Sequence, residues 1–201
     1  MNPPSSHPVV RRNRGMLLLI VAIFFGSLLG AGVLRFSGWQ PAGMKNHGEL
    51  LQPPTDLRAI TPHLADGTAY HWQPLLRLWR ITLAPPTDCI EACIALMRDL
   101  DKVRQLTGQD ADRVQVLWIG TPPAAMPHFA AVQVLQRDPT LLARLPRLRT
   151  NTGKGHVGGG GMPLDVPVYV IDPNGFVVLR YAPGFDPGGL RADLSKLLKL
   201  M

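Results

Sequence analysis

The sequence has little cysteine, and its basic residues form no patch beyond those that flank one apolar stretch. It holds two cysteines among 201 residues, four positions apart, and a disulfide across so short a loop would stabilise a fold little, because its entropic gain grows with loop length. The chain is basic, with a formal charge of +7, but its arginines and lysines are scattered. These absences exclude a disulfide-stapled fold and argue against nucleic acid as a partner. The excess positive charge suits anionic lipid or an acidic protein.

Charge is absent from one long stretch, residues 16–34 (MLLLIVAIFFGSLLGAGVL). A helix of this length covers roughly 28 Å at about 1.5 Å per residue, close to the hydrocarbon thickness of a bilayer. The stretch is longer than the apolar part of a typical signal peptide, and no strong small-x-small pattern ends it. It therefore predicts an uncleaved membrane anchor over residues 16–35. A signal peptide cleaved near residues 30–32 is the alternative.

The charges that flank this stretch predict its orientation. Arg11, Arg12 and Arg14 precede it and Arg35 follows it, so the positive-inside rule places the N-terminus in the cytoplasm. We therefore expect a single-pass protein of the inner (plasma) membrane, with residues 1–15 as a cytoplasmic tail and the rest in the periplasm or an equivalent extracytoplasmic space. Disulfides persist in that compartment.

About 165 residues follow the anchor, which suits one domain with a real core. We expect residues 36–56 to form a tether and residues 57–201 to form an α/β domain. Twenty glycines and twenty prolines mark the loops between its elements. The patterns predict a hairpin about Asp66-Gly67, strands over 75–83, 113–120, 166–171 and 176–181, and helices over 89–106, within 124–149 and over 186–200.

Both cysteines lie at the start of the predicted helix 89–106. Asp88 and Glu91 have the spacing of a capping box there. Cys89 and Cys93, at positions i and i+4, should project from one face one turn apart. Unpaired amides at a helix N-terminus stabilise thiolates, which suits redox exchange or a soft metal ion. A buried pair or an inert disulfide is the alternative.

The order of these segments resembles a thioredoxin-like fold. A strand (LWRITL) leads to CIEAC at a helix start, and VPVYVIDPNG is followed by a strand and a helix. Together with one N-terminal span, a GELL-type tether and the Cys-x-x-x-Cys pair, this is similar to the Sco/SenC family, whose members are membrane-anchored assembly factors for the copper site of cytochrome c oxidase. The resemblance implies a three-layer thioredoxin-like domain behind a single transmembrane helix.

The resemblance also implies roles for particular residues. Cys89 and Cys93 match the redox and copper-binding cysteines of the family, and Pro167 matches the cis proline that faces the cysteines in thioredoxin-like proteins. The third copper ligand of the family, a histidine, is replaced here by Leu164. His156 is the nearby histidine that would have to take its place as a metal ligand.

These observations leave three hypotheses. The first is a membrane-tethered thiol–disulfide oxidoreductase that acts in the assembly of the oxidase copper site, with Cys89 attacking and Cys93 resolving. The second is a direct copper carrier that uses Cys89, Cys93 and His156. The third is a scaffold without catalysis. The partner in each case would be an oxidase subunit or a copper protein, and copper is the one cofactor that the resemblance suggests.

The predicted orientation can be tested with fusions. A reporter enzyme that is active only outside the cytoplasm should be active when fused after Met201, because the charges about residues 16–34 place the C-terminus there. Enzyme activity in intact cells is the measurement. Activity only from a reporter that requires the cytoplasm would contradict the assigned compartment.

Overall fold

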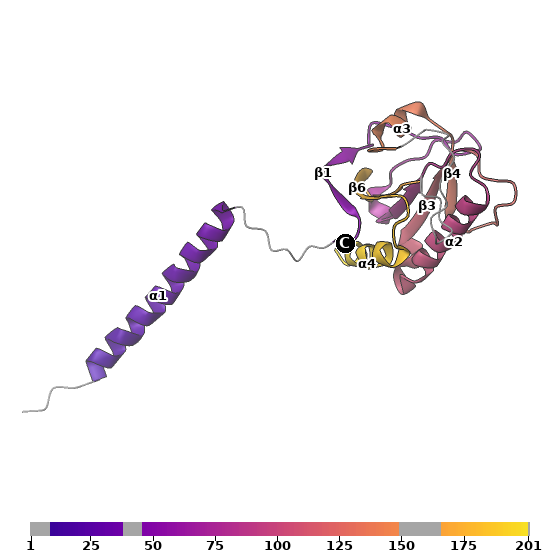
Figure 1. Ribbon diagram of the computed structural model, residues 1–201. Helices are drawn as coiled ribbons and strands as arrows, with labels where there is room; N and C mark the ends of the chain where they lie inside the picture. Colours follow the sequence, from indigo (N-terminus) through magenta and orange to yellow (C-terminus); the bar gives the residue numbers. More distant parts are fainter. Residues whose placement is uncertain (1–8, 38–45, 149–165, 201) are drawn as a thin grey trace, which may run out of the picture. The chain divides into compact units, whose positions relative to one another are not determined.

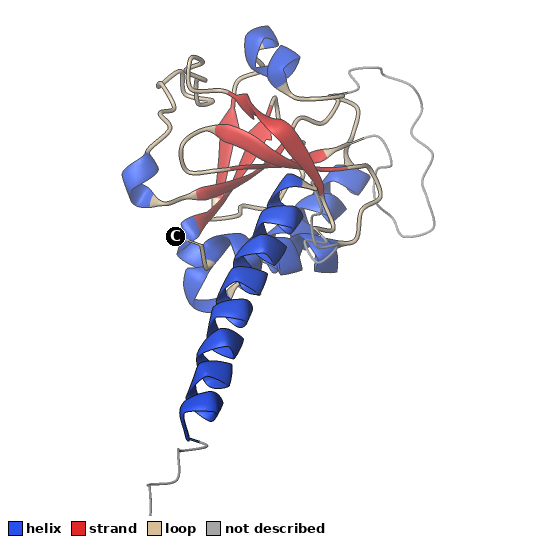
Figure 2. Cartoon of the chain, turned by 90° about the vertical axis from the view of Figure 1, so that its left-hand side faces the viewer, coloured by secondary structure: helices blue, strands red, loops and turns tan. Residues whose placement is uncertain are grey.

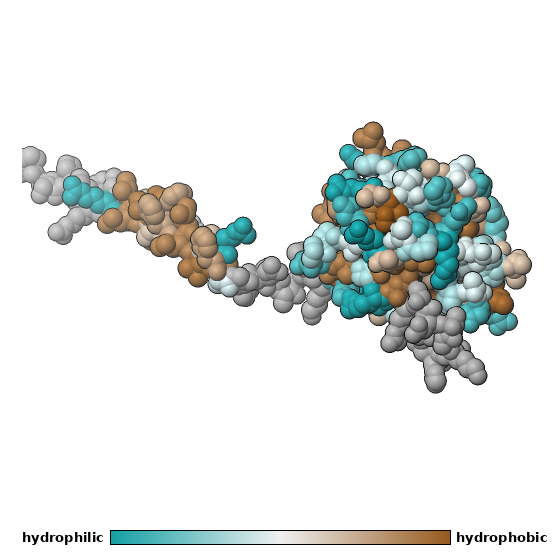
Figure 3. All heavy atoms as spheres, turned by 90° about the horizontal axis from the view of Figure 1, so that it is seen from above, coloured by the Kyte–Doolittle hydropathy of each residue, from teal (hydrophilic) through white to brown (hydrophobic). Residues whose placement is uncertain are grey.

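The structure is a computed structural model that describes residues 9–37, 46–148 and 166–200. It divides into two compact units, Met1–Lys45 and Asn46–Met201. The first unit contains helix α1 (Val9–Phe36), of which Arg14–Phe36 is long and apolar enough to cross a membrane. Apolar side chains cover most of this helix, whereas the surface of the second unit is mixed (Figure 3). The apolar helix expected over residues 16–35 is confirmed.

The second unit is built on one sheet with the strand order β1-β6-β5-β2-β3-β4 (Figure 1). Strands β2, β3 and β4 are parallel to one another, while β5 is antiparallel to β2, β6 to β5 and β1 to β6. The strands are β1 (Glu49–Asp56), β2 (Trp79–Leu83), β3 (Val114–Ile119), β4 (Val132–Leu135), β5 (Val168–Ile171) and β6 (Phe176–Tyr181).

Helices cover both faces of this sheet, which gives three layers (Figure 2). One core cluster joins β2, β3 and β5 to α2 (Glu91–Gln105) and α4 (Pro187–Leu198). The other joins β3 and β5 to α3 (Pro139–Arg144). Strand β3 contributes Val116 and Trp118 to the first cluster and Leu117 and Ile119 to the second, so it is buried on both of its faces. The predicted α/β three-layer fold is observed.

Strand β1 was expected to be part of the tether. Residues 49–56 instead form the edge of the sheet, with Glu49 opposite Arg180 and Asp56 opposite Phe176. The register shifts between Leu50 and Thr55, where the sequence has two consecutive prolines. Proline lacks an amide hydrogen and is tolerated at an edge or a bulge, so the prolines that suggested a tether are compatible with this strand.

The region 124–149 was predicted to be helical and is mostly not. Residues 132–135 form β4, which pairs with β3, and only the short helix α3 follows. The Asp138 carboxylate caps α3 by accepting the Thr140 amide at 2.8 Å, and Pro139 occupies its first turn. The prolines therefore separate a strand from a short helix of six residues, and Pro139 begins that helix.

The hairpin predicted about Asp66-Gly67 is reduced to a turn with an isolated bridge between His63 and Ala69. The segment that should have been its second strand is held by side chains. The Tyr70 hydroxyl accepts a hydrogen bond from Arg80 Nε at 2.6 Å, and Trp72 Nε1 donates to the carbonyls of Leu57 and Ile60, each at 3.1 Å. The strand predicted over 75–83 is likewise shortened to β2, after a 3-10 turn, η1 (Pro74–Leu76).

Asp193 of α4 joins the start of the domain to its C-terminal helix. Its carboxylate is 1% exposed and accepts the amides of His47 at 2.6 Å and Gly48 at 3.0 Å and the Tyr181 hydroxyl at 2.8 Å. Burial acts to raise the pKa of Asp193, but these hydrogen bonds outweigh it, so the pKa lies below its usual value. The charged form of Asp193 therefore stabilises the fold.

Replacing Asp193 by Asn should lower the free energy of unfolding at neutral pH by roughly 1–3 kcal/mol, because the variant keeps the shape and loses the charged acceptor. Since the pKa is lowered by folding, the stabilisation is present above the ordinary aspartate pKa and is lost as the pH falls through the native value. Urea unfolding of the full chain in detergent across acid pH measures both effects. Asp112→Asn, at an exposed position, is the control and should change neither.

Candidate thiol–disulfide site

The candidate site lies at one end of the sheet, where β2 ends and β5 begins. Leu83, the last residue of β2, is opposite Val168 of β5 and Trp118 of β3. The chain then leaves β2 through residues 84–90 and enters α2. Pro85 and Pro86 cannot continue the strand, so both cysteines are placed just beyond this end of the sheet.

Cys89 and Cys93 form a disulfide, with 2.04 Å between the sulfur atoms and 5.6 Å between the Cα atoms. Helix α2 begins at Glu91, later than predicted, and its N-cap is Ile90. The predicted capping box of Asp88 and Glu91 is wrong, since the N-cap makes no side-chain hydrogen bond. The Cys89 amide instead donates to the Pro86 carbonyl at 3.3 Å, and this turn delays the start of the helix.

The two sulfur atoms differ in exposure. Cys93 lies in the first turn of α2 and is 0% exposed, in the same core cluster as Leu83 and Val168. Cys89 precedes the helix, is half-buried and packs against the edge of that cluster. The neighbouring Ile90 side chain is 55% exposed. Cys89 is therefore the more accessible of the two cysteines.

Local electrostatics act on the pair in two directions. The unpaired amides at the N-terminus of α2 favour a thiolate on Cys93, whereas the Glu91 carboxylate in the same turn opposes it. Arg137, which follows β4, donates from Nη1 to the Pro85 carbonyl at 3.0 Å. This bond ties the loop before Cys89 to the segment that follows β4, two strands away in the sheet, and brings a positive charge to the same end of the sheet.

Pro167 lies immediately before β5 and is buried. Because Leu83 is opposite Val168, Pro167 is at the same end of the sheet as the loop that carries the cysteines. The cis bond predicted before Pro167 is wrong: between described residues the cis peptide bond is Gln52-Pro53. A trans proline at the start of a strand needs no special arrangement, because it precedes the first ladder hydrogen bond.

The predicted metal ligand His156 and the substituted position Leu164 lie outside the described residues. Within residues 9–37, 46–148 and 166–200, no group of three or more histidine, cysteine or acidic side chains is placed to hold a metal ion. After reduction, Cys89 and Cys93 would offer two thiolates, a donor set that suits Cu(I) but leaves its coordination incomplete.

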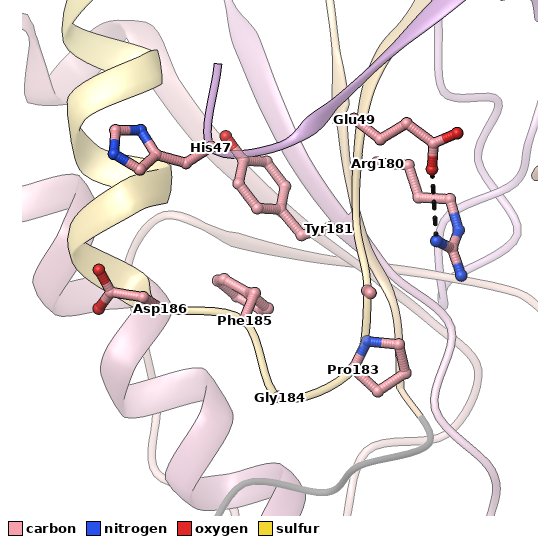
Figure 4. A pocket seen from close by; sticks show the side chains of 9 residues that line it. His47, Glu49, Arg180, Tyr181, Pro183, Gly184, Phe185 and Asp186 are labelled. Atoms are coloured by element: carbon pink, nitrogen blue, oxygen red, sulfur yellow. Dashed lines mark ion pairs between the residues drawn. The ribbon is translucent and has the colours of Figure 1, made fainter. Parts of the chain in front are cut away.

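A second feature of this end of the sheet was missed by sequence reasoning. A hollow of about 460 Å³ lies between the start of β1 and the turn after β6, with the rings of Tyr181 and Phe185 on one side and the ion pair of Glu49 with Arg180 on the other (Figure 4). His47 also lines it, with Nδ1 at 3.2 Å from Asp193. No sequence signal connects His47 and Asp193, which are 146 residues apart.

The difference in exposure predicts an order of reactivity. After gentle reduction of the folded protein, iodoacetamide should alkylate Cys89 at least tenfold faster than Cys93, because only a thiol that the reagent can reach reacts. Peptide mass spectrometry at successive times measures the two rates. The same protein in urea is the control, where the rates should converge. Equal rates in the folded protein would contradict the burial of Cys93.

Comparisons with known proteins agree with this geometry. The family model of the "transmembrane-like, thioredoxin-like, C-terminal domain" matches residues 79–201, while no curated protein matches the sequence. Similar solved structures include Arabidopsis thaliana ScoI with copper bound, at 17% identity and a TM-score of 0.50 over 77% of this chain and 99% of that one. A SCO1/SenC family lipoprotein from Bacillus anthracis is 16% identical, with a TM-score of 0.49 over 73% of this chain and 98% of that one. At such identities the likeness shows the fold alone, and the family model carries the assignment: the chain belongs to the transmembrane-like, thioredoxin-like C-terminal domain family.

Proposed function

We propose that this protein is a membrane-anchored thiol–disulfide exchange protein whose reacting pair is Cys89 and Cys93. The observation that carries the proposal is the disulfide between a half-buried and a fully buried sulfur atom at the start of α2. A loop of this length stabilises a fold little, so structural stapling does not account for the bond. A reachable sulfur backed by an unreachable one suits exchange.

In the oxidised form, a thiolate of the partner attacks the Cys89 sulfur. The bond between Cys89 and Cys93 breaks, and Cys93 leaves with the electron pair as a thiolate facing the N-terminal amides of α2. A second thiolate of the partner then attacks its own sulfur in the mixed disulfide. The partner is released with a disulfide, and both cysteines of this chain are reduced by the two electrons gained.

The reverse sequence reduces a disulfide of the partner. The Cys89 thiolate attacks that disulfide, and the Cys93 thiolate then attacks Cys89 to release the partner as a dithiol. The geometry supports the same assignment in both directions, because Cys89 is the sulfur that touches the partner. A dithiol protein of the same compartment would supply the two electrons for a further cycle.

We further propose that the partner carries the cysteines of a copper site in a respiratory cytochrome c oxidase, or is a copper protein that serves it. The support is the Sco/SenC resemblance of residues 45–200 and the fold shared with a ScoI that binds copper. Copper is then a cargo of the partner's site. Leu164 at the position of the family histidine favours thiol exchange over direct copper carriage, because two thiolates alone hold Cu(I) in an open site.

Trapping of the mixed disulfide tests the exchange function. The variant Cys93→Ser should accumulate a mixed disulfide, because the Cys89 thiolate can still attack a disulfide of the partner while no Cys93 thiol remains to release it. The matched variant Cys89→Ser should accumulate little, since Cys93 is buried. Non-reducing electrophoresis of membranes, followed by mass spectrometry of the adduct, is the measurement. Equal trapping by both variants, or by neither, would contradict the proposed roles.

Copper binding separates exchange from carriage. The reduced full-length protein should cycle between dithiol and disulfide yet bind Cu(I) weakly in a competition with a chromophoric chelator, and His156→Ala should not change that affinity. Tight one-to-one binding that is lost in His156→Ala would instead identify a copper carrier. Thiols that do not exchange, together with no copper binding, would leave a scaffold function.

A further inference from the structure

Helix α4 presents a strongly basic face to solvent. Its exposed side chains include Arg191, Lys196 and, at the C-cap, Lys199; these three residues are called the basic face below. At 100° per residue they fall within one arc of about 140°, separated by the small residues Gly188, Ala192 and Ser195. The opposite arc packs into the core through Leu190, Leu194 and Leu198.

The acidic residues of this region do not neutralise the basic face. Asp193 is the one carboxylate within α4, and it is buried. It contacts four polar groups of His47, Gly48 and Tyr181. It also accepts a hydrogen bond from Lys196 Nζ at 3.3 Å. Asp186 precedes the helix and is occupied by the amides of Gly188 and Gly189. The charge of Lys196 is thus partly offset, while Arg191 and Lys199 extend from a surface that has no acidic side chain of the same helix.

The chain that comes from the membrane anchor joins the domain at this helix. The amide and Nδ1 of His47 both bond to Asp193, and a Cβ atom on Gly189 would lie 2.7 Å from the Cβ of His47. The last residue of α1 is Phe36, so eleven residue steps separate it from His47. Even a fully extended chain of that length reaches no more than roughly 40 Å. Chain length therefore limits how far the His47 end of α4 can move from the end of α1.

We propose that the basic face of α4 binds the anionic phospholipid headgroups of the bilayer leaflet that faces the domain. Each lysine or arginine close to an anionic surface strengthens membrane association roughly fivefold. The covalent anchor makes this binding intramolecular, so that a contact too weak for a free domain is populated. An acidic protein would offer the same charge, but only the bilayer is brought to α4 by the chain itself.

This contact would orient the site as well as hold the domain. Helix α2, which begins beside the disulfide, packs next to α4 on the same face of the sheet, whereas α3 covers the opposite face (Figure 1). A domain resting on α4 would hold the Cys89 loop near the membrane surface. The lipid contact itself does not depend on the proposed redox function, because its residues lie outside the reacting pair.

Energy transfer in nanodiscs tests the proposal. The full-length protein, with its native disulfide intact and a donor fluorophore on Leu200→Cys, is placed in discs that contain an acceptor-labelled lipid. Transfer should be greater in discs with phosphatidylglycerol than in discs of phosphatidylcholine alone. High salt should remove the difference, because the Debye length falls to about 3 Å at 1 M. Transfer that is equal in both lipids, or insensitive to salt, would overturn the proposal.

Charge-reversal variants assign the effect to α4. Arg191→Glu with Lys199→Glu should weaken the phosphatidylglycerol-dependent association by more than roughly 25-fold, because the loss of two positive charges alone costs about fivefold each. The matched control is Arg77→Glu with Arg144→Glu, which changes net charge equally at exposed positions away from α4 and should retain the effect. Equal losses in both pairs would show a net-charge effect and overturn the assignment. The neutral pair Arg191→Gln with Lys199→Gln should lose part of the association. If the unfolding midpoint of this variant is unchanged, misfolding is excluded as the cause of the loss.

Discussion

The burial of strand β2 on both faces of the sheet determines where the chemistry of this protein lies. Ile81 and Leu83 pack against α2 and α4, and the strand is hydrogen-bonded to β3 on one side and β5 on the other. These contacts fix the position of β2 in the sheet and the end of the sheet at which the chain leaves it. The chain that leaves it is stopped by two prolines, turns at residues 86–89 and enters α2. Both cysteines are placed by that path.

The same path explains why the two sulfur atoms are unequal. Cys89 is still in the turn, at the edge of the core, while Cys93 has entered the helix and faces the sheet. A capped helix beginning at Cys89 would have brought both sulfur atoms to similar positions in its first turn and a half. The delayed start of α2 therefore pairs one partly exposed cysteine with one buried cysteine, an arrangement that suits the proposed thiol exchange.

The proposed functions of the anchor, α4 and the disulfide depend on a second junction. Asp193 fastens His47 and Gly48 to α4, so the chain arrives at the domain on the helix that carries the basic face. His47, Pro167 and the Cys89 loop all lie at one end of the sheet, because β1 begins, β5 begins and β2 ends there. Membrane attachment and proposed reactivity thus share one end of the domain.

Patterns local in the sequence determined much of this protein. An uncharged stretch of residues predicts α1, and short runs rich in apolar residues predict β3 and β6. The residues Asp172-Pro173-Asn174-Gly175 between β5 and β6 form a turn, with the Phe176 amide bonded to the Asp172 carboxylate at 2.7 Å. The position of the cysteine pair near a helix start was also readable, because it depends on spacing along a single segment. The thioredoxin-like fold was inferred from a resemblance in the order of the segments.

Only the tertiary structure decided the features that depend on a distant partner. Residues 49–56 become a strand because β6 offers an unpaired edge, and residues 132–135 become one because β3 does, although prolines and helical spacing suggested otherwise. The exposure of each cysteine and the meeting of His47 with Asp193 likewise follow from packing. Local propensity is worth less than a buried hydrogen-bonded ladder, so long-range pairing overrides it wherever the two disagree.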